Sequence, residues 1–421
     1  MIRQDDKFNK IKDIVTFCEK NVPYYRIKLK NAKIKSLQDF KKIPLVSKEV
    51  YNLNTPPKNY NMLSGKDSNC FLFSTGGTTS NPKYILRDYK DINEQYLEYS
   101  GLNVNENDTV INLFMPGIWG IFTTANLTLM KFGCKIIPYG GTNLNKENCK
   151  TILKLMREFK VNFLIGVPST IISIISYLKL EKEFSVLRRV EKIFFLGEMI
   201  TESMVKYLKD AMPNIKIKSK YGLMESAGIG YQCRYLEGNN YHIFPDRYVE
   251  IIKSGEKEKK GLIAVTTLNH RLIPLLRYMT GDLGIISDKR CKCGEETVLQ
   301  VLGRNDDEVI FASIHLSVNL LSTVIKNFGQ ECSQIFQIVL LKKRGLDFIK
   351  IRIESESLMS LKQKLILIKK ITKVIYKEIP DIIDAINSKK IAGFSINIVN
   401  PSSIKKIDSS GKVKKIIDLR K

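Results

Sequence analysis

Several features that would indicate a special class of protein are missing from this sequence of 421 residues. It has no internal repeat, no low-complexity segment and no basic tail. The first residues, MIRQDDKFNKIKDIV, include acidic residues where a secretion signal needs an apolar core, so we expect no such signal. The eight cysteines are scattered, which indicates reduced thiols or metal ligands in a cytoplasmic protein rather than a disulfide framework.

Acidic residues are scarce relative to basic ones, and the formal net charge is +25. Such an excess can indicate binding to nucleic acid or to a membrane surface. From Arg304 onward, however, 22 Lys/Arg face 12 Asp/Glu, a charge of +10, and the first 303 residues carry the remaining +15. Because no basic block stands out, a lysine-rich proteome explains the charge better than a nucleic-acid site does, and we expect no nucleic-acid partner.

Charged residues are absent from Val110 to Met130, a window long enough to cross a bilayer. The window does contain Pro116, Gly117, Gly120 and two asparagines, which suit a buried strand, turn and helix better than a membrane span. We therefore expect no membrane partner.

Apolar runs from 108 to 222 alternate with helical patterns, as in a mostly parallel sheet with helices on both faces. Expected strands are Val110–Phe114, Lys135–Tyr139, Phe163–Val167, Lys192–Leu196 and Lys216–Lys220; expected helices are Lys146–Lys160, Ser169–Leu178 and Thr201–Ala211. From 241 to 303 the sequence becomes strand-rich, which predicts a smaller antiparallel, barrel-like sheet. Its expected strands are Arg247–Lys253, Gly261–Leu268, Leu283–Ser287 and Thr297–Leu302.

Residues after Arg304 indicate a compact α+β unit. Phe336–Lys342 and Phe348–Glu354 flank Arg344-Gly345 as a hairpin, and Phe394–Val399 adds a strand. The intervening helix is expected to bury one apolar stripe, made of Leu358, Leu361, Leu365, Ile368 and Ile375. We predict a large α/β domain over residues 1–303 and a small, mobile domain over 304–421.

A polar, glycine-rich stretch follows the apolar residues at Phe71–Phe73. Thr75 to Lys83, TGGTTSNPK, combines two glycines, hydroxyl groups and a lysine, a composition suited to binding phosphates. The alternative is a plain surface loop after a strand. The GxxxxGK[ST] spacing of a Walker A loop is absent, so the mononucleotide fold of that motif is not supported.

Four further clusters follow in order: Tyr221-Gly-Leu-Met-Glu225, Arg277-Tyr-Met-Thr-Gly-Asp282, Gly303-Arg-Asn-Asp-Asp307 and Gly411-Lys412. Together with Thr75–Lys83 they resemble the core motifs of the adenylate-forming superfamily of acyl-CoA synthetases and adenylation domains. The sequence is most similar to the phenylacetate–CoA ligase-like branch, through Asn21–Arg26, Ser36–Pro44 and Cys291-Lys-Cys-Gly294 as well. The resemblance spans nearly the whole chain.

This resemblance implies a site for ATP. Tyr221 and Gly222 would contact adenine, with Gly197 and Glu198 on the adenine wall, and Asp282 and Arg304 would bind the ribose. The residues implied to grip the phosphates are Thr75, Gly76, Gly77, Thr78, Thr79 and Lys83.

The resemblance also implies the chemistry. Glu225 would hold Mg²⁺, Asp306 would be a hinge, and Lys412 would place its ammonium between a carboxylate substrate and the α-phosphate. A carboxylate that attacks a phosphate must overcome anion repulsion, which a cation reduces. The alternative for Lys412 is a solvated lysine of the tail.

Two positions depart from the family pattern. Met224 stands where Thr or Ser usually precedes the glutamate, and a thioether cannot donate a hydrogen bond to a phosphate. The segment around Ser313 lacks the usual glycine and proline of a loop that serves the second half-reaction. We therefore expect slower adenylation, and the acceptor is left open.

Cys233, His242, Cys291 and Cys293 offer three thiolates and an imidazole, the ligand set of a structural zinc site. The alternative is ordinary thiols and a loop histidine, because Cys-x-Cys is less diagnostic than Cys-x-x-Cys. Zinc would join the segment after Tyr221 to the segment before Gly303.

The leading functional hypothesis is an ATP-dependent carboxylate–thiol ligase. It forms acyl-AMP and pyrophosphate and then transfers the acyl group to CoA or to the phosphopantetheine of a carrier protein. Phe114 and Trp119 indicate an aromatic or small apolar acid. The alternatives are transfer to a protein thiol or an amine, or a nucleotide-binding protein without turnover. The sequence leaves a homodimer open.

Overall fold

The computed structural model describes residues 4–30, 32–65, 68–74, 83–90, 96–141, 145–253, 255, 258–304, 308–311, 314–405 and 412–420. The phosphate-loop residues Thr75 to Thr79, the hinge Asp306 and Ser313 lie outside this part of the chain. The fold comprises two compact units: Met1–Asn107 with Pro116–Ile136 and Lys218–Asn305, and Asp108–Met115 with Ile137–Ile217 and Asp306–Lys421. The division at residue 304 stays a prediction, since it concerns which parts move together.

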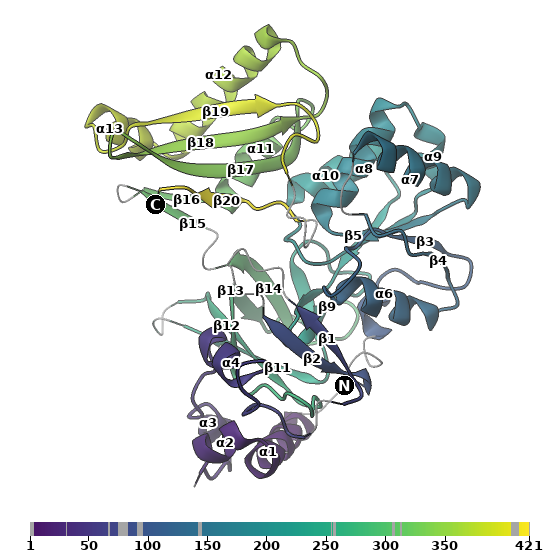
Figure 1. Ribbon diagram of the computed structural model, residues 1–421, viewed down its shortest axis with the longest axis vertical. Helices are drawn as coiled ribbons and strands as arrows, with labels where there is room; N and C mark the ends of the chain where they lie inside the picture. Colours follow the sequence, from purple (N-terminus) through teal and green to yellow (C-terminus); the bar gives the residue numbers. More distant parts are fainter. Residues whose placement is uncertain are drawn as a thin grey trace. The chain divides into compact units, whose positions relative to one another are not determined.

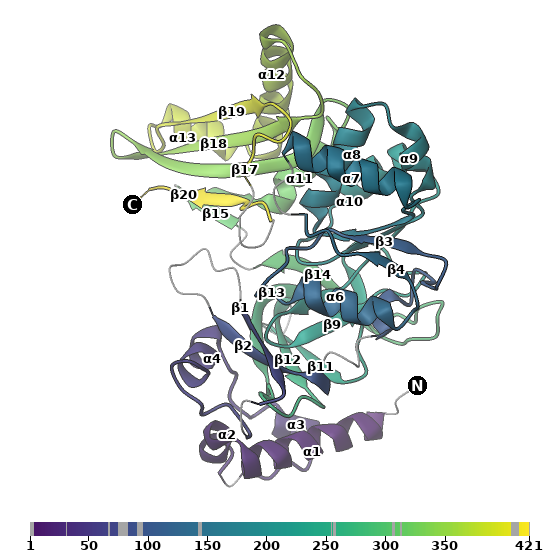
Figure 2. The same ribbon diagram turned by 45° about the vertical axis from the view of Figure 1, so that its right-hand side comes forward.

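The first unit begins with four helices that pack on an antiparallel sheet (Figure 2): α1 (Gln4–Asn21), α2 (Pro23–Lys28), α3 (Leu37–Phe40) and α4 (Lys48–Asn54). Helix α1 buries Ile11, Ile14 and Cys18, the face that its sequence periodicity predicts. At the start of α3 the Ser36 side chain accepts a hydrogen bond from the Asp39 backbone N–H and so caps the helix.

Two sheets complete the first unit, together with the short helix η1 (Tyr96–Tyr99) and α6 (Ile121–Met130). Strands β1 (Cys70–Ser74) and β2 (Tyr84–Asp88) form an antiparallel pair that brackets the predicted phosphate loop. A seven-stranded sheet runs in the order β11 (Arg247–Ile252), β12 (Gly261–Thr267), β13 (Tyr278–Ser287), β14 (Val298–Arg304), β10 (Asn240–Ile243), β9 (Ala227–Tyr231), β8 (Tyr221–Leu223). The four predicted strands are confirmed as β11 to β14, whereas β8, β9 and β10 were not foreseen.

A five-stranded sheet has its three central strands in the second unit, and Figure 1 labels its strands β3, β4 and β5. The order is β4 (Lys135–Ile137), β3 (Thr109–Asn112), β5 (Phe163–Gly166), β6 (Lys192–Phe195), β7 (Lys216–Ser219). Strand β5 pairs in parallel with β3 and with β6, and every residue of these three strands is buried. Helices α7 (Lys146–Glu158), α8 (Pro168–Leu180), α9 (Phe184–Arg189) and α10 (Glu202–Ala211) contribute to the same core. This confirms the predicted α/β alternation, and the Thr201 side chain caps α10 by accepting a hydrogen bond from the Met204 backbone N–H.

The rest of the second unit is an α+β layer (Figure 1). The sheet order is β19 (Gly393–Val399), β18 (Leu346–Ser355), β17 (Cys332–Lys343), β20 (Ile416–Asp418), and the smaller pair is β15 (Glu308–Phe311) with β16 (Ile314–Ser317). Helices α11 (Val318–Lys326), α12 (Leu361–Glu378) and α13 (Asp381–Asn387) share its core. The predicted hairpin with its turn at Arg344-Gly345 is confirmed.

The predicted apolar stripe of α12 was wrong at its beginning. Leu358 and Leu361 are 78% and 74% exposed and Leu365 is also exposed, whereas Leu367, Ile371 and Ile375 are buried. A capping box at Ser360 starts the helix at Leu361, so Leu358 precedes it. Leu361 and Leu365 are within the helix, but the core of the unit takes up the neighbouring face. The buried face therefore consists of Leu367, Ile371 and Ile375, which are spaced four residues apart.

Within the described residues, no helix has both the length and the apolar character that a membrane crossing requires. The uncharged window from Val110 to Met130 contains most of strand β3, a connecting turn and helix α6, as the interpretation of a buried strand, turn and helix requires.

Candidate active site and metal centre

Glu225 lies on the short connection between β8 and β9 and is buried. One of its carboxylate oxygens, Oε1, accepts hydrogen bonds from Lys83 Nζ at 3.2 Å and from the Tyr278 hydroxyl at 3.0 Å. Burial and the Glu225 charge raise the pKa of Tyr278, so the phenol stays protonated and donates. The structure thus brings together two predicted site residues, Lys83 and Glu225. It adds Tyr278, which sequence reasoning missed although it lies in the cluster from Arg277 to Asp282.

Glycine is required next to Tyr221 because the hairpin is tight. A Cβ atom on Gly222 would lie 2.5 Å from the Ala227 carbonyl oxygen, closer than any side chain tolerates. Ala227 itself has a φ of +58°, a left-handed conformation that reverses the chain after Glu225. Gly222 therefore allows the hairpin that presents Glu225.

Tyr221, Asp282 and Arg304 form a second group in the first unit. The Tyr221 hydroxyl donates to Asp282 Oδ2 at 2.7 Å, and Arg304 Nε lies 4.0 Å from Asp282 Oδ1. Asp282 and Arg304 are direct partners in the β13–β14 ladder, so the backbone register fixes their separation. Burial and the nearby Asp282 charge raise the pKa of Tyr221. The hydroxyl therefore orients a carboxylate, and the predicted contact of this residue with adenine stays a prediction.

Met224 packs into a small apolar group. A Cβ on Gly120 would lie 2.8 Å from Phe73 Cγ and 2.9 Å from Met224 Cε, and Gly120 has a φ of +71°. Glycine at this turn therefore leaves room for the methionine and phenylalanine side chains. The departure at Met224 adds an apolar contact where the family pattern has a hydroxyl.

The second unit brings Lys412, close to the end of the chain, to the loop after β6. A Cβ atom on Gly197, whose φ is +96°, would lie 3.0 Å from Lys412 Cε and 3.3 Å from Lys412 Nζ. The neighbouring residue is anchored, because the Val413 backbone N–H donates to Glu198 Oε1 at 3.0 Å. Gly197, Glu198 and Lys412, predicted from distant segments, are thus adjacent.

Glu198 also holds the start of helix α8. Its Oε2 accepts from the Ser169 backbone N–H at 2.9 Å, and its Oε1 accepts from the Ser169 hydroxyl at 3.0 Å. A carboxylate at a helix N-terminus is favourable because the first N–H groups of a helix have no partner within the helix. One carboxylate therefore fixes both the α8 start and the backbone beside Lys412. Sequence reasoning missed Ser169 in this role.

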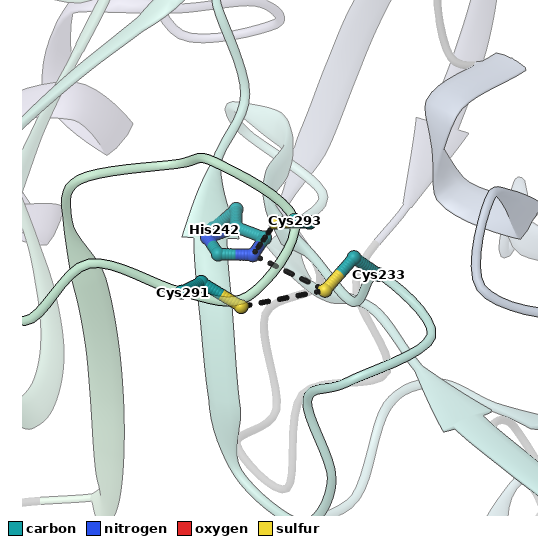
Figure 3. Close-up of side chains that lie close together, drawn as sticks. All are labelled: Cys233, His242, Cys291 and Cys293. Carbon is teal, nitrogen blue, oxygen red and sulfur yellow. Dashed lines mark hydrogen bonds between the residues drawn. The ribbon is translucent and has the colours of Figure 1, made fainter.

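The four proposed zinc ligands converge in the first unit (Figure 3). Cys233 follows β9, His242 is on β10, and Cys291 and Cys293 lie between β13 and β14. Cys233 Sγ is 3.8 Å from Cys291 Sγ and 3.3 Å from His242 Nε2, and Cys293 Sγ is 3.1 Å from the same nitrogen. All four ligand atoms lie within 4.8 Å of one another.

This geometry fits a tetrahedral ion. With Zn–S bonds of about 2.3 Å, two sulfurs of a tetrahedron lie about 3.8 Å apart. His242 Nδ1 contacts the Thr297 carbonyl oxygen at 3.2 Å, which favours a proton on Nδ1 and leaves Nε2 as the ligand atom. The geometry of these four residues therefore fits a zinc site better than it fits the alternative of ordinary thiols and a loop histidine.

Comparison with known proteins places this arrangement in context. Residues 14–253, more than half of the chain, match the family model described as AMP-binding enzyme. Phenylacetate-coenzyme A ligase of Thermus thermophilus is 23% identical over 377 residues, which cover 82% of this chain and 80% of the relative. Indoleacetate–lysine synthetase of Pseudomonas savastanoi is 24% identical over 298 residues, 69% of this chain and 70% of the relative.

Solved structures share the fold. A crystal structure of 2-hydroxyisobutyryl-CoA ligase in the postadenylation state has a TM-score of 0.79 at 18% identity, covering 99% of this chain and 90% of the other. An acyl acid amido synthetase superposes with a TM-score of 0.67 at 14% identity, covering 98% and 91%. These likenesses confirm the predicted fold class.

Proposed function

Since the chain belongs to the AMP-binding enzyme family, we propose that it activates a carboxylic acid with ATP. The acid oxygen attacks the α-phosphorus and forms an acyl-AMP, and the bond to the β-phosphate breaks to release pyrophosphate. A thiol then attacks the acyl carbon and releases AMP. The observation that carries this proposal is Lys412 beside Gly197, with its neighbour anchored on Glu198.

Lys412 supplies positive charge where two anions must meet. Its Nζ is held near a loop that contains a glycine at positive φ, so backbone can approach a ligand closely there. An ammonium that is in place before the reaction stabilises the negative charge that develops on the α-phosphate, without the cost of reorganising solvent. The anchored Val413 N–H limits the positions that the lysine can take.

The adenosine part of ATP is assigned to Tyr221 and Gly222, with Asp282 and Arg304 at the ribose. The Tyr221 hydroxyl keeps Asp282 oriented, and a carboxylate so held can accept two ribose hydroxyl hydrogens. Thr75, Gly76, Gly77, Thr78, Thr79 and Lys83 are assigned to the phosphates.

Glu225 is the proposed residue for Mg²⁺. Its buried carboxylate accepts hydrogen bonds from Lys83 and Tyr278, which fix the direction of the group. This suits Mg²⁺, which takes one or two carboxylates together with phosphate oxygens. When bound, Mg²⁺ neutralises charge on the phosphates. Lys83 pairs with Glu225 and is free to turn to a phosphate when ATP and metal bind.

We propose that Cys233, His242, Cys291 and Cys293 hold a structural zinc. The set is closed, with four protein ligands, so zinc would stabilise the segments that follow Tyr221 and precede Arg304 rather than act on substrate. We further propose that residues 304–421 turn about Asp306 between the two half-reactions.

CoA or a carrier-protein phosphopantetheine is the proposed acceptor. A specific observation also favours an amine: one relative is named for joining indoleacetate to lysine, and a structure of the same fold is an acyl acid amido synthetase. The acid is proposed to be aromatic or small and apolar, on the basis of Phe114 and Trp119.

An exchange assay followed by an acceptor assay tests these proposals. Labelled pyrophosphate is incubated with ATP and a panel of arylacetic, benzoic and short aliphatic acids, and we expect exchange that requires one class of acid. The active acid is then incubated with CoA, with phosphopantetheinylated carrier protein or with lysine. A thioester product supports CoA or the carrier protein as the acceptor, and an amide product supports an amine. Exchange without any added acid would contradict the proposed function.

A further inference from the structure

Three buried side chains of the first unit are joined end to end. Arg87 Nη1 lies 3.0 Å from His270 Nδ1, and Arg247 Nη2 lies 2.8 Å from His270 Nε2. His270 and Arg247 are 1% and 2% exposed, and Arg87 is also buried. We call these three residues the arginine–histidine bridge. They come from β2, from the β12–β13 connection and from the start of β11, so tertiary structure alone brings them together.

The two ends of this bridge bind the backbone on either side of Glu225. Arg87 Nη2 donates to the Met224 carbonyl oxygen, and Arg247 Nη2 donates to the Ser226 carbonyl oxygen at 2.9 Å. Met224, Glu225 and Ser226 are the whole connection between β8 and β9. The carbonyl before and the carbonyl after the carboxylate are therefore both fixed by guanidinium groups.

Histidine chemistry limits how the bridge works. A guanidinium only donates, and a neutral imidazole has one acceptor nitrogen, so His270 accepts from one arginine at a time. Burial, reinforced by the charges of Arg247 and Arg87, lowers the pKa of His270, which keeps the ring neutral. A carboxylate in the same place would accept from both arginines.

Strand β2 carries Arg87 and directly follows Lys83. Lys83, just before this strand, pairs with the Glu225 carboxylate, and Arg87, four residues later on the strand, holds the Met224 carbonyl. Arg277, a third buried arginine of this unit, has a different arrangement: it binds Glu250 through two parallel hydrogen bonds, at 3.0 Å each. Arg277 also donates to the backbone carbonyl oxygens of Lys41 and Ile43, and Arg247 is paired with Asp246. The difference is the target, because Arg87 and Arg247 donate to the backbone on either side of Glu225.

We propose that Arg87, His270 and Arg247 are positioning residues that fix the direction of the Glu225 carboxylate for the metal–nucleotide complex. This proposal rests on the proposed function. The bridge does not touch the substrate. It acts by holding both peptide groups next to Glu225, which is what a preorganised site needs from its support.

Binding of Mn²⁺ tests the proposal without turnover. Mn²⁺ takes oxygen ligands as Mg²⁺ does, and electron paramagnetic resonance reports the free ion in the presence of a non-hydrolysable ATP analogue. We expect His270→Ala to weaken Mn²⁺ binding about tenfold, the equivalent of about 1.4 kcal/mol. His270→Glu should bind within about threefold of the wild type, because its carboxylate accepts from both arginines.

Lys218→Met is the matched control. Lys218 is a buried cation that donates to the carbonyl oxygens of Arg234 and Leu236, which lie between β9 and β10 and not on the connection that carries Glu225. This variant should lower the melting temperature and leave the Mn²⁺ affinity unchanged. Should His270→Ala fail to fold, Arg87→Lys replaces it, since a lysine keeps the charge but cannot reach His270 and Met224 together.

The outcomes separate the bridge from the proposed function. Wild-type affinity in folded His270→Ala, or an equal loss in Lys218→Met, would overturn the bridge alone. A Mn²⁺ affinity as low in His270→Glu as in His270→Ala would show that histidine acts only by its shape, and would also overturn the bridge. A wild-type protein that binds the ATP analogue but no Mn²⁺ would overturn the bridge and the assignment of Glu225 together.

Discussion

Removal of the Lys412 ammonium should affect one half-reaction and spare the other. Lys412 Nζ is held 3.3 Å from the position of a Cβ on Gly197, and the next backbone N–H is anchored on Glu198. The charge is therefore in place before the substrates react. Losing one preorganised electrostatic contact of this kind costs about 10²- to 10³-fold in kcat, or about 2.7–4 kcal/mol. We expect Lys412→Ala to slow pyrophosphate release by at least about 10²-fold.

Two rapid-mixing assays separate the half-reactions. The first follows pyrophosphate release from ATP and acid in a single turnover, and the second follows transfer from chemically supplied acyl-AMP to the thiol acceptor. Transfer should survive in Lys412→Ala, because the lysine acts only at the α-phosphate. Lys414→Ala is the control: this exposed lysine lies two residues away, so its loss should change neither rate by more than about twofold.

Equal losses in both half-reactions of a folded Lys412→Ala variant would contradict the proposed role of this lysine. An equal slowing of pyrophosphate release in Lys414→Ala would also contradict it, since the effect would then come from general positive charge rather than from one placed ammonium.

Three further substitutions have definite expected results. Asp306→Pro should slow acyl transfer and spare pyrophosphate release in the same assays, because proline fixes φ near −65° and restrains a rotation; wild-type transfer would argue against a hinge there. Purified protein should hold close to one zinc per chain by metal analysis, and a zinc-free wild type prepared without chelator would refute the site. Cys291→Ser should lower the free energy of unfolding by about 3 kcal/mol, which is the stabilisation expected from zinc at about 100 times its Kd. Met224→Thr should lower the KM for ATP about fivefold, the value of one new hydrogen bond to a phosphate, and an unchanged KM would mean that the hydroxyl does not reach it.

Local patterns predicted the elements with strong periodicity or clear caps. The strands from Val110 to Ser219 and the start of α10 at Thr201 follow from apolar runs and one hydroxyl, which depend only on their neighbours in sequence. The stripe of α12 failed because tertiary packing selects the buried face, and the core contains Leu367, Ile371 and Ile375 rather than Leu361 and Leu365. The connection that carries Glu225 was also missed as a hairpin, since its left-handed Ala227 gives no sequence signal.

The site was predictable in its residue types but not in its contacts. The zinc ligands could be proposed from thiols and an imidazole, yet Cys233 and Cys291 are 58 residues apart, and only the fold brings them to 3.8 Å. The arginine–histidine bridge had no signal at all. Arg87 and His270 are 183 residues apart and belong to no spaced motif.

Isotope labelling of the carboxylate oxygen tests whether the acid attacks the α-phosphorus of ATP. The acid that gives the strongest pyrophosphate exchange is prepared with ¹⁸O in its carboxylate and incubated with ATP and the acceptor, and the nucleotide product is analysed by mass spectrometry. Attack of the carboxylate on the α-phosphorus leaves one ¹⁸O in AMP after acyl transfer, with unlabelled pyrophosphate, and this is the predicted result. Production of ADP with ¹⁸O in inorganic phosphate would mean attack on the γ-phosphorus and would contradict the account.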